Sequence, residues 1–127
     1  MVVAIAAACA SAPLAPSRVT AGQWGGTGVS LMVTDKGGHV EFDCAHGDLS
    51  VALTPDQHGQ FSVPGTFVSE HGGPIRAGES ETAVPVTYLG VATATTMTLS
   101  IRLDTTGGIL GTYSLTRGAA GRLVKCL

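Results

Sequence analysis

Apolar and polar residues alternate along most of this chain, and this period-two pattern constrains the fold more than any other feature of the sequence. The clearest case is residues 97–103, where apolar and polar side chains strictly take turns in MTLSIRL. Successive side chains of a β-strand point to opposite faces, so such a segment buries one face and leaves the other in water. Since no segment shows a helical period of 3.6 residues, the sequence predicts an all-β protein.

Glycine-rich turns separate the alternating segments, with 18 Gly in 127 residues. The pattern predicts strands over residues 28–35, 39–44, 49–53, 61–63, 66–71, 86–94, 97–103 and 109–117. Because the connections are short and local, we expect a small antiparallel up-and-down barrel of about eight strands, which leaves no sheet edge unpaired. A two-sheet β-sandwich is the alternative, although it usually needs longer crossovers.

Local signals add details to this expected strand order. A turn is expected near His46-Gly47, and Val51 is expected to point inward from the strand that follows. Pro64-Gly65 is expected to break a strand, because proline cannot donate to a sheet. Gly90 is expected at a β-bulge or a sharp coil, because Leu89 and Val91 break the parity that Val86 and Tyr88 share.

The first twelve residues, MVVAIAAACASA, form an uncharged apolar run that ends in small residues. The run predicts a secretory signal with its linker over residues 1–17 and one barrel domain over residues 18–127. It is too short to cross a bilayer, which takes about 20 apolar residues. Cys9 follows three alanines, as in a bacterial lipobox, so a lipid anchor at Cys9 and a freely secreted form both stay open, beside a disordered tail. We expect an exported protein, periplasmic or extracellular, that meets a membrane only through that anchor.

Cys44 and Cys126 remain for the folded domain. Two cysteines in an exported domain predict one disulfide, although the strand parity places Cys44 on the inner face. The bond would close a loop of about eighty residues and contribute about 4 kcal/mol. Two reduced, buried thiols are the alternative.

The charge balance argues against two classes of partner. Seven basic and nine acidic residues give a net charge of −2, which offers no footprint for nucleic acid or for an anionic membrane surface. Aromatic residues are only 5% of the chain and fall at inward positions, so they form no stacking platform for single-stranded nucleic acid. We expect no nucleic-acid partner.

Four histidines, at positions 39, 46, 58 and 71, raise the question of a metal or catalytic site. Their spacing matches no metal signature such as H-E-x-x-H, so we expect neither a metal nor a cofactor. Glu70, His71 and Arg76 are the best acid–base candidates, but adjacent residues on a strand point to opposite faces. A small barrel enzyme that uses this trio therefore stays an alternative, and we expect no catalysis.

The segment from Gly72 to Pro85 is the one long polar connection, and loops of this length in compact domains are usually functional or mobile. With the residues at its entrance it forms a candidate binding loop of Glu70, His71, Arg76 and Glu79. We expect a non-catalytic binding module, whose ligand is either a small apolar molecule in the barrel mouth or a protein partner. An inhibitor of a periplasmic hydrolase is an alternative.

The triplet Gly22-Gln23-Trp24 and the inward parity of Arg117 at the end of the last strand resemble the calycin superfamily of lipocalin and avidin-like barrels. The resemblance implies that Arg117 packs across the Trp24 indole and closes one end of the barrel by cation–π stacking. Trp24 is the only tryptophan, so the tryptophan cage that binds biotin in avidins is missing.

A second resemblance is to the periplasmic lysozyme-inhibitor lipoproteins, which are small barrels stapled by a disulfide. Residues 42–51, FDCAHGDLSV, and the terminal Cys126-Leu127 resemble that family. Its inhibitory loop, Ser-Gly-x-Arg-Tyr, has no counterpart in this sequence.

Overall fold

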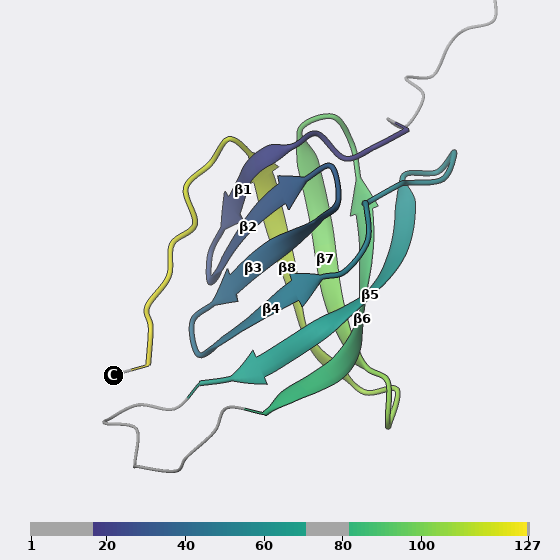
Figure 1. Cartoon of the computed structure of the whole chain (residues 1–127). Helices are drawn as coiled ribbons and strands as arrows, with labels where there is room; N and C mark the ends of the chain where they lie inside the picture. The colour runs from purple at the N-terminus through teal and green to yellow at the C-terminus, as the bar shows by residue number, and fades with distance from the viewer. Residues whose placement is uncertain (1–16, 71–81, 127) are drawn as a thin grey trace, which may run out of the picture.

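Eight antiparallel strands close into one β-barrel (Figure 1). The structure is a computed structural model that describes residues 17–70 and 82–126. The strands are β1 (Gly22–Gly26), β2 (Val29–Thr34), β3 (Gly37–Phe42), β4 (Ala45–Leu49), β5 (Gln60–Ser69), β6 (Ala83–Ala92), β7 (Thr96–Leu103) and β8 (Ile109–Arg117). Each strand pairs with the next one along the chain. The predicted all-β, up-and-down barrel is confirmed, and the sandwich alternative is wrong.

The barrel closes where β8 returns to β1, and this is its shortest pairing. The two strands share two residue pairs, whereas β5 and β6 share nine. The C-terminal tail, residues 118–126, continues the closure beyond β8. In it Arg122 donates its backbone N–H to Gly26 O at 3.0 Å and accepts from Gly28 N at 2.8 Å. The tail therefore takes part in holding the first and last strands together.

The inside of the barrel is filled by side chains. Trp24 from β1 and Tyr88 from β6 are the largest fully buried residues, and the other inward residues of the core keep at most 6% of their surface exposed. The polar atoms of both rings have partners, because Trp24 Nε1 donates to Thr20 O at 2.8 Å and the Tyr88 hydroxyl donates to Thr66 O at 2.7 Å. A side chain beside a water-sized cavity keeps accessible surface, so no such space adjoins the core residues that are less than 2% exposed, which include Leu31, Tyr88 and Leu99.

Gly90 lies in a regular strand and not at the expected bulge. It pairs with Phe61 on β5 and with Leu99 on β7 without any shift of register. A Cβ at Gly90 would overlap the Phe61 ring, so glycine is required here by close packing. The irregular pairing of the barrel lies instead between Ile101 and Arg102 on β7.

The start of the barrel and the β3–β4 hairpin differ from the sequence pattern. Residues 22–26 form β1, which the alternation did not predict because this segment has three glycines. The turn after β3 lies at Asp43 and Cys44 and not near His46-Gly47, which are part of β4. As a result β4 ends at Leu49, and Val51 is 44% exposed instead of buried.

Pro64 and Gly65 lie within β5 and do not interrupt it. The Pro64 carbonyl accepts from Ser50 N at 2.9 Å, just past the end of β4. The N and O of one strand residue point to the same side, so the missing N–H of Pro64 also faces that end and the ladder to β6 loses no bond. The two segments predicted over 61–63 and 66–71 are therefore one strand, Gln60–Ser69.

Cys44 and Cys126 form the predicted disulfide, with their Cα atoms 5.2 Å apart and a sequence separation of 82. Cys44 is exposed in the β3–β4 turn, so its predicted inward orientation is wrong. The bond indicates an oxidising compartment. Among the described residues there is no helix long and apolar enough to cross a membrane.

The expected signal and linker, with Cys9, lie outside the described residues except for Ser17. The same holds for most of the expected loop over 72–85, since the description resumes at Thr82. The end of that loop is corrected, because β6 already begins at Ala83.

Candidate functional site

A row of polar side chains lies on the outer face of the β3–β4 hairpin. The register of the hairpin sets His39 opposite Asp48 and Glu41 opposite His46. These positions alternate with buried residues on both strands, so all four side chains project outward. The two-residue turn that ends at Cys44 is what brings the two pairs into register.

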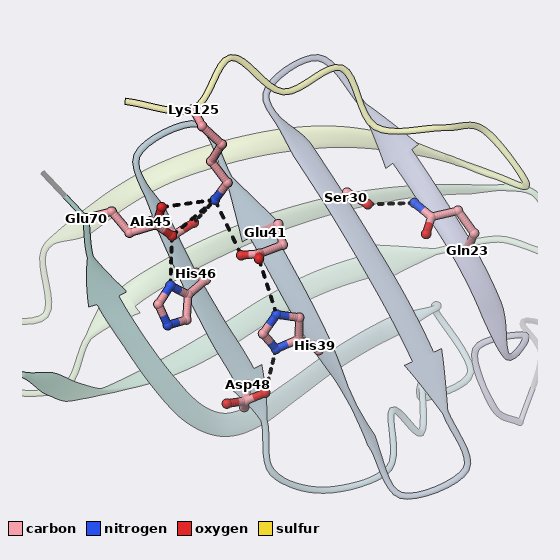
Figure 2. A network of polar contacts seen from close by, with 9 residues as sticks. All are labelled: Gln23, Ser30, His39, Glu41, Ala45, His46, Asp48, Glu70 and Lys125. Carbon is pink, nitrogen blue, oxygen red and sulfur yellow. Dashed lines mark hydrogen bonds and ion pairs between the residues drawn. The ribbon is translucent and has the colours of Figure 1, made fainter. Parts of the chain in front are cut away.

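Two further residues reach this row from outside the hairpin, as Figure 2 shows. Glu70 lies just past β5, where its backbone N–H donates to Cys44 O at 2.8 Å. Lys125 comes from the C-terminal tail and points down between Glu41 and Glu70. The six residues His39, Glu41, His46, Asp48, Glu70 and Lys125 are called the outer polar cluster below.

The Lys125 ammonium group is the centre of the outer polar cluster. Its Nζ lies 3.1 Å and 3.3 Å from the two Glu70 oxygens and 3.5 Å from Glu41 Oε2. It also donates to the backbone carbonyl of Ala45 at 3.3 Å. Two carboxylates and one carbonyl therefore surround a single cation, and Lys125 is about a third exposed there.

The two histidines extend the network to either side of Lys125. His46 Nδ1 lies 2.7 Å from Glu70 Oε2, and His39 Nδ1 lies 2.8 Å from Asp48 Oδ1. His39 Nε2 is 3.6 Å from Glu41 Oε1, which joins the two halves. The chain of contacts thus runs without a gap from Asp48 to Glu70.

These contacts change the protonation of two groups. Partial burial alone would raise the pKa of Glu70, but the hydrogen bonds and charges of His46 and Lys125 outweigh it and hold this pKa below its usual range. The hydrogen bond to Asp48 is the main cause that raises the pKa of His39, and the charges of Asp48 and Glu41 add to it against partial desolvation. Glu70 is therefore an ionised acceptor at neutral pH and not a general acid.

Three members of the outer polar cluster have the chemistry of metal ligands. One ligand atom each from Glu41, His46 and Glu70 lies within 4.8 Å of the others. All three side chains are half-buried, so the atoms are held in place yet open to solvent on one side. The arrangement offers two carboxylate oxygens and one imidazole nitrogen to a cation.

The C-terminal tail that carries Lys125 is fixed at several points. It passes so close over β1 that a Cβ on Gly25 would overlap the backbone of residues 119–121. Further on, Val124 N donates to Asp43 Oδ1 at 2.8 Å and Cys126 N donates to Asp43 O at 3.2 Å. The disulfide at Cys126 then ties the residue next to Lys125 to the hairpin turn.

A second surface feature is a shallow groove of about 430 Å³ on the outer face of β5, β6 and β7, called the β5–β7 groove below. Two cross-strand rows line it, Gln60–Val91–Thr98 and Ser62–Leu89–Ser100. Each row has an aliphatic residue on the central strand and polar residues on the flanking strands. Val91 is 48% exposed, so the groove has an apolar floor that meets water.

Of the four residues in the predicted binding loop, the structure describes one. Glu70 belongs to the outer polar cluster, whereas His71, Arg76 and Glu79 lie outside the described residues. The expectation of no metal rested on spacing along the chain, and spacing does not register the ligand-type side chains that the fold brings together from β3, β4 and the residue after β5. Glu41 and Lys125 were not among the predicted site residues. A correct position for the turn at Asp43 would have paired Glu41 with His46, but the predicted disulfide alone does not show which residues the Lys125 side chain contacts.

Trp24 and Arg117 are directly opposite each other in the pairing of β1 with β8. The indole is fully buried, and the Arg117 side chain is exposed. Stacking of the guanidinium on the indole stays a prediction.

Comparisons of the chain with protein-family models, with curated proteins and with solved structures find no match. The assignment of a function therefore depends on the geometry described above.

Proposed function

We propose that this protein is an exported, non-catalytic binding module that recognises a protein partner on its outer surface. The partner would place one or two apolar side chains in the β5–β7 groove. Export is supported by the disulfide, which forms and persists in oxidising compartments. A secretory signal, with or without a lipid anchor at Cys9, is part of the same proposal.

The filled barrel is the observation that carries the proposal. Barrels that hold small molecules have an internal cavity, whereas Leu31, Tyr88 and Leu99 inside this one are fully buried against their neighbours. A small apolar ligand would have to displace core side chains, which costs packing energy. This favours the protein partner among the two kinds of ligand that the sequence left open.

The chemistry of the β5–β7 groove suits a protein side chain. Leu89 and Val91 offer apolar surface at its centre, and the hydroxyl and amide groups around them can accept or donate hydrogen bonds. An apolar centre within a polar rim is the usual anatomy of a protein–protein interface. The Glu70 carboxylate, by contrast, is held in ion pairs, which supports a binding role over an acid–base one.

The calycin resemblance fits this proposal as a statement about fold. A closed antiparallel barrel of eight strands, with Trp24 on β1 facing the end of β8, supports kinship with calycins. Membership in that superfamily is proposed here, and the same structure would serve a partner-binding barrel of separate origin.

Affinity capture with matched surface variants tests the proposal. Wild type, Val91→Lys and Met32→Lys would be used to retain proteins from the exported fraction of the source cells. Met32 is the control because it is 46% exposed, much like Val91 at 48%, but lies on β2. We expect one protein to be retained by wild type and Met32→Lys and lost with Val91→Lys, and the purified pair to bind directly.

Two results would contradict the proposal. One is a set of retained proteins that is the same for all three baits. The other is a small apolar molecule that native mass spectrometry finds in the folded protein and that is released on denaturation, since this would reveal a barrel that opens to a ligand.

A further inference from the structure

We propose that Glu41, His46 and Glu70 form a binding site for a divalent transition-metal ion, with Zn²⁺ as the best match, and that the Lys125 ammonium is the resident cation that the metal displaces. The inference goes beyond the proposed partner binding, because the outer polar cluster and the β5–β7 groove use different strands and different residues.

The positions of the ligand atoms suit a single ion. Tetrahedral Zn²⁺ with bonds of about 2.1 Å keeps its ligand atoms roughly 3.4 Å apart. The three candidate atoms already lie within 4.8 Å of one another, and His46 Nδ1 is 2.7 Å from Glu70 Oε2. The two glutamate side chains would rotate to bring their oxygens to the ion, while the strand pairing of Glu41 with His46 stays as it is.

The contacts of Lys125 show that this place already holds a cationic group. Its ammonium is surrounded by Glu41, Glu70 and the Ala45 carbonyl, with Nζ to oxygen distances between 3.1 and 3.5 Å. The charges also fit an exchange. When Lys125 swings out, two carboxylates remain, and their charge of −2 is balanced by one divalent ion.

The mixture of ligands selects the kind of metal. Imidazole favours Zn²⁺ and other first-row transition metals, whereas Ca²⁺ and Mg²⁺ prefer oxygen ligands alone. Three protein ligands leave the fourth position of Zn²⁺ to water or to an outside group. The imidazole must coordinate as a neutral ring through a nitrogen that carries no proton.

A supporting set of contacts surrounds the ligands. Glu41 Oε1 faces His39 Nε2 at 3.6 Å, and His39 in turn contacts Asp48. Such outer contacts orient the carboxylates of metal sites. Because His39 contacts Oε1 of Glu41, the other oxygen, Oε2, is the one that would exchange Lys125 for the metal.

Zinc titration of the full-length chain tests the inference. All proteins carry Cys9→Ser and no polyhistidine tag, so that neither a thiol nor a tag binds the metal. Competition with a chromogenic chelator near pH 7.5 would measure the affinity of wild type, Lys125→Ala, His46→Ala and Glu70→Gln for Zn²⁺. His58→Ala is the matched control, because His58 is exposed in the turn before β5.

We expect wild type to bind one Zn²⁺ and Lys125→Ala to bind it about tenfold more tightly, because the charge-assisted hydrogen bonds of the competing ammonium are gone. His46→Ala and Glu70→Gln should each weaken binding about tenfold or more, and His58→Ala should leave it unchanged. The ring resonances of His46 in wild type should shift on addition of Zn²⁺, which gives a readout that does not depend on any variant being folded.

The proposal is overturned if Lys125→Ala binds Zn²⁺ no better than wild type, or if His58→Ala weakens binding as much as His46→Ala. It is equally overturned if Zn²⁺ leaves the His46 ring resonances in place. In those cases the outer polar cluster is an ion-pair network that fastens the tail to the barrel.

Discussion

Loss of the Cys44–Cys126 disulfide should cost this protein a large part of its stability. The bond closes a loop of 82 residues. The loop-closure entropy of an unfolded chain, −2.1 − 1.5R ln n in cal/mol/K, gives about 4.5 kcal/mol at 25 °C for a loop of this length. Marginally stable domains have a total free energy of unfolding of about 5–15 kcal/mol, so Cys126→Ser should unfold at a far lower urea concentration than wild type.

Urea denaturation followed by Trp24 fluorescence would measure this difference, with every protein in a Cys9→Ser background. Wild type treated with a reductant should behave like Cys126→Ser, and the double variant Cys44→Ser/Cys126→Ser should be no less stable than either single one, because the loop can be opened only once. A loss below about 1 kcal/mol, or a reductant that leaves the wild-type curve unmoved, would refute the loop-closure argument.

Three further outcomes are expected. Thermal melts should show that Gly90→Ala destabilises the barrel by about 1–3 kcal/mol, because the added Cβ overpacks against Phe61. The control Gly108→Ala, at an exposed position with no backbone in the way of a Cβ, should cost well under about 1 kcal/mol. Equal losses would contradict the packing argument. Because the folded-state pKa of Glu70 is lowered, its ion pairs should stabilise wild type over Glu70→Gln by about 1 kcal/mol at pH 7. Urea curves should show this advantage vanish as the pH falls below 4.5, the usual pKa of a glutamate, and through the lowered pKa of Glu70. An advantage that persists in acid would contradict the ion-pair argument. If Arg117 covers the indole, Arg117→Ala should change the emission of Trp24 and lower the melting temperature, and an unchanged spectrum and melt would remove the calycin argument.

The sequence was most informative where side chains alternate without interruption. The bounds of β7 differ from the prediction by one residue, because this strand carries a regular apolar face. The bounds of β8 agree with the prediction over 109–117, although Leu115 is the one buried residue of that strand. Glycine caused the main errors. It hid β1, whose residues are mostly glycine, and it suggested a bulge at Gly90, where the lack of a side chain makes room for Phe61. Neither position carries a local sequence signal. Gly25 on β1 is packed under the tail, and Gly90 is packed against Phe61 on the neighbouring strand.

The outer polar cluster shows the same limit for the site. A register between β3 and β4 can in principle be derived from a two-residue turn, and it would have joined Glu41 to His46. Lys125 could not be placed in this way, because the tail is irregular and its path is set by the disulfide and by backbone contacts far away in sequence. The predicted disulfide limited where residue 125 lies, but it did not indicate which charges the lysine would meet.

Because β1 and β8 share so short a pairing, the oxidation state of the Cys44–Cys126 disulfide should affect whether the protein self-associates. With two residue pairs at this closure, the tail helps to keep the first and last strands together, and the one covalent link among its attachments is the reducible disulfide. Once that bond is reduced, separation of β1 from β8 converts a closed barrel into an open sheet with two exposed edges. Unpaired edges are templates for other chains. We therefore expect oxidation to protect the two end strands from pairing with other chains, and a reducing environment to favour fibres or swapped dimers built from β1 and β8.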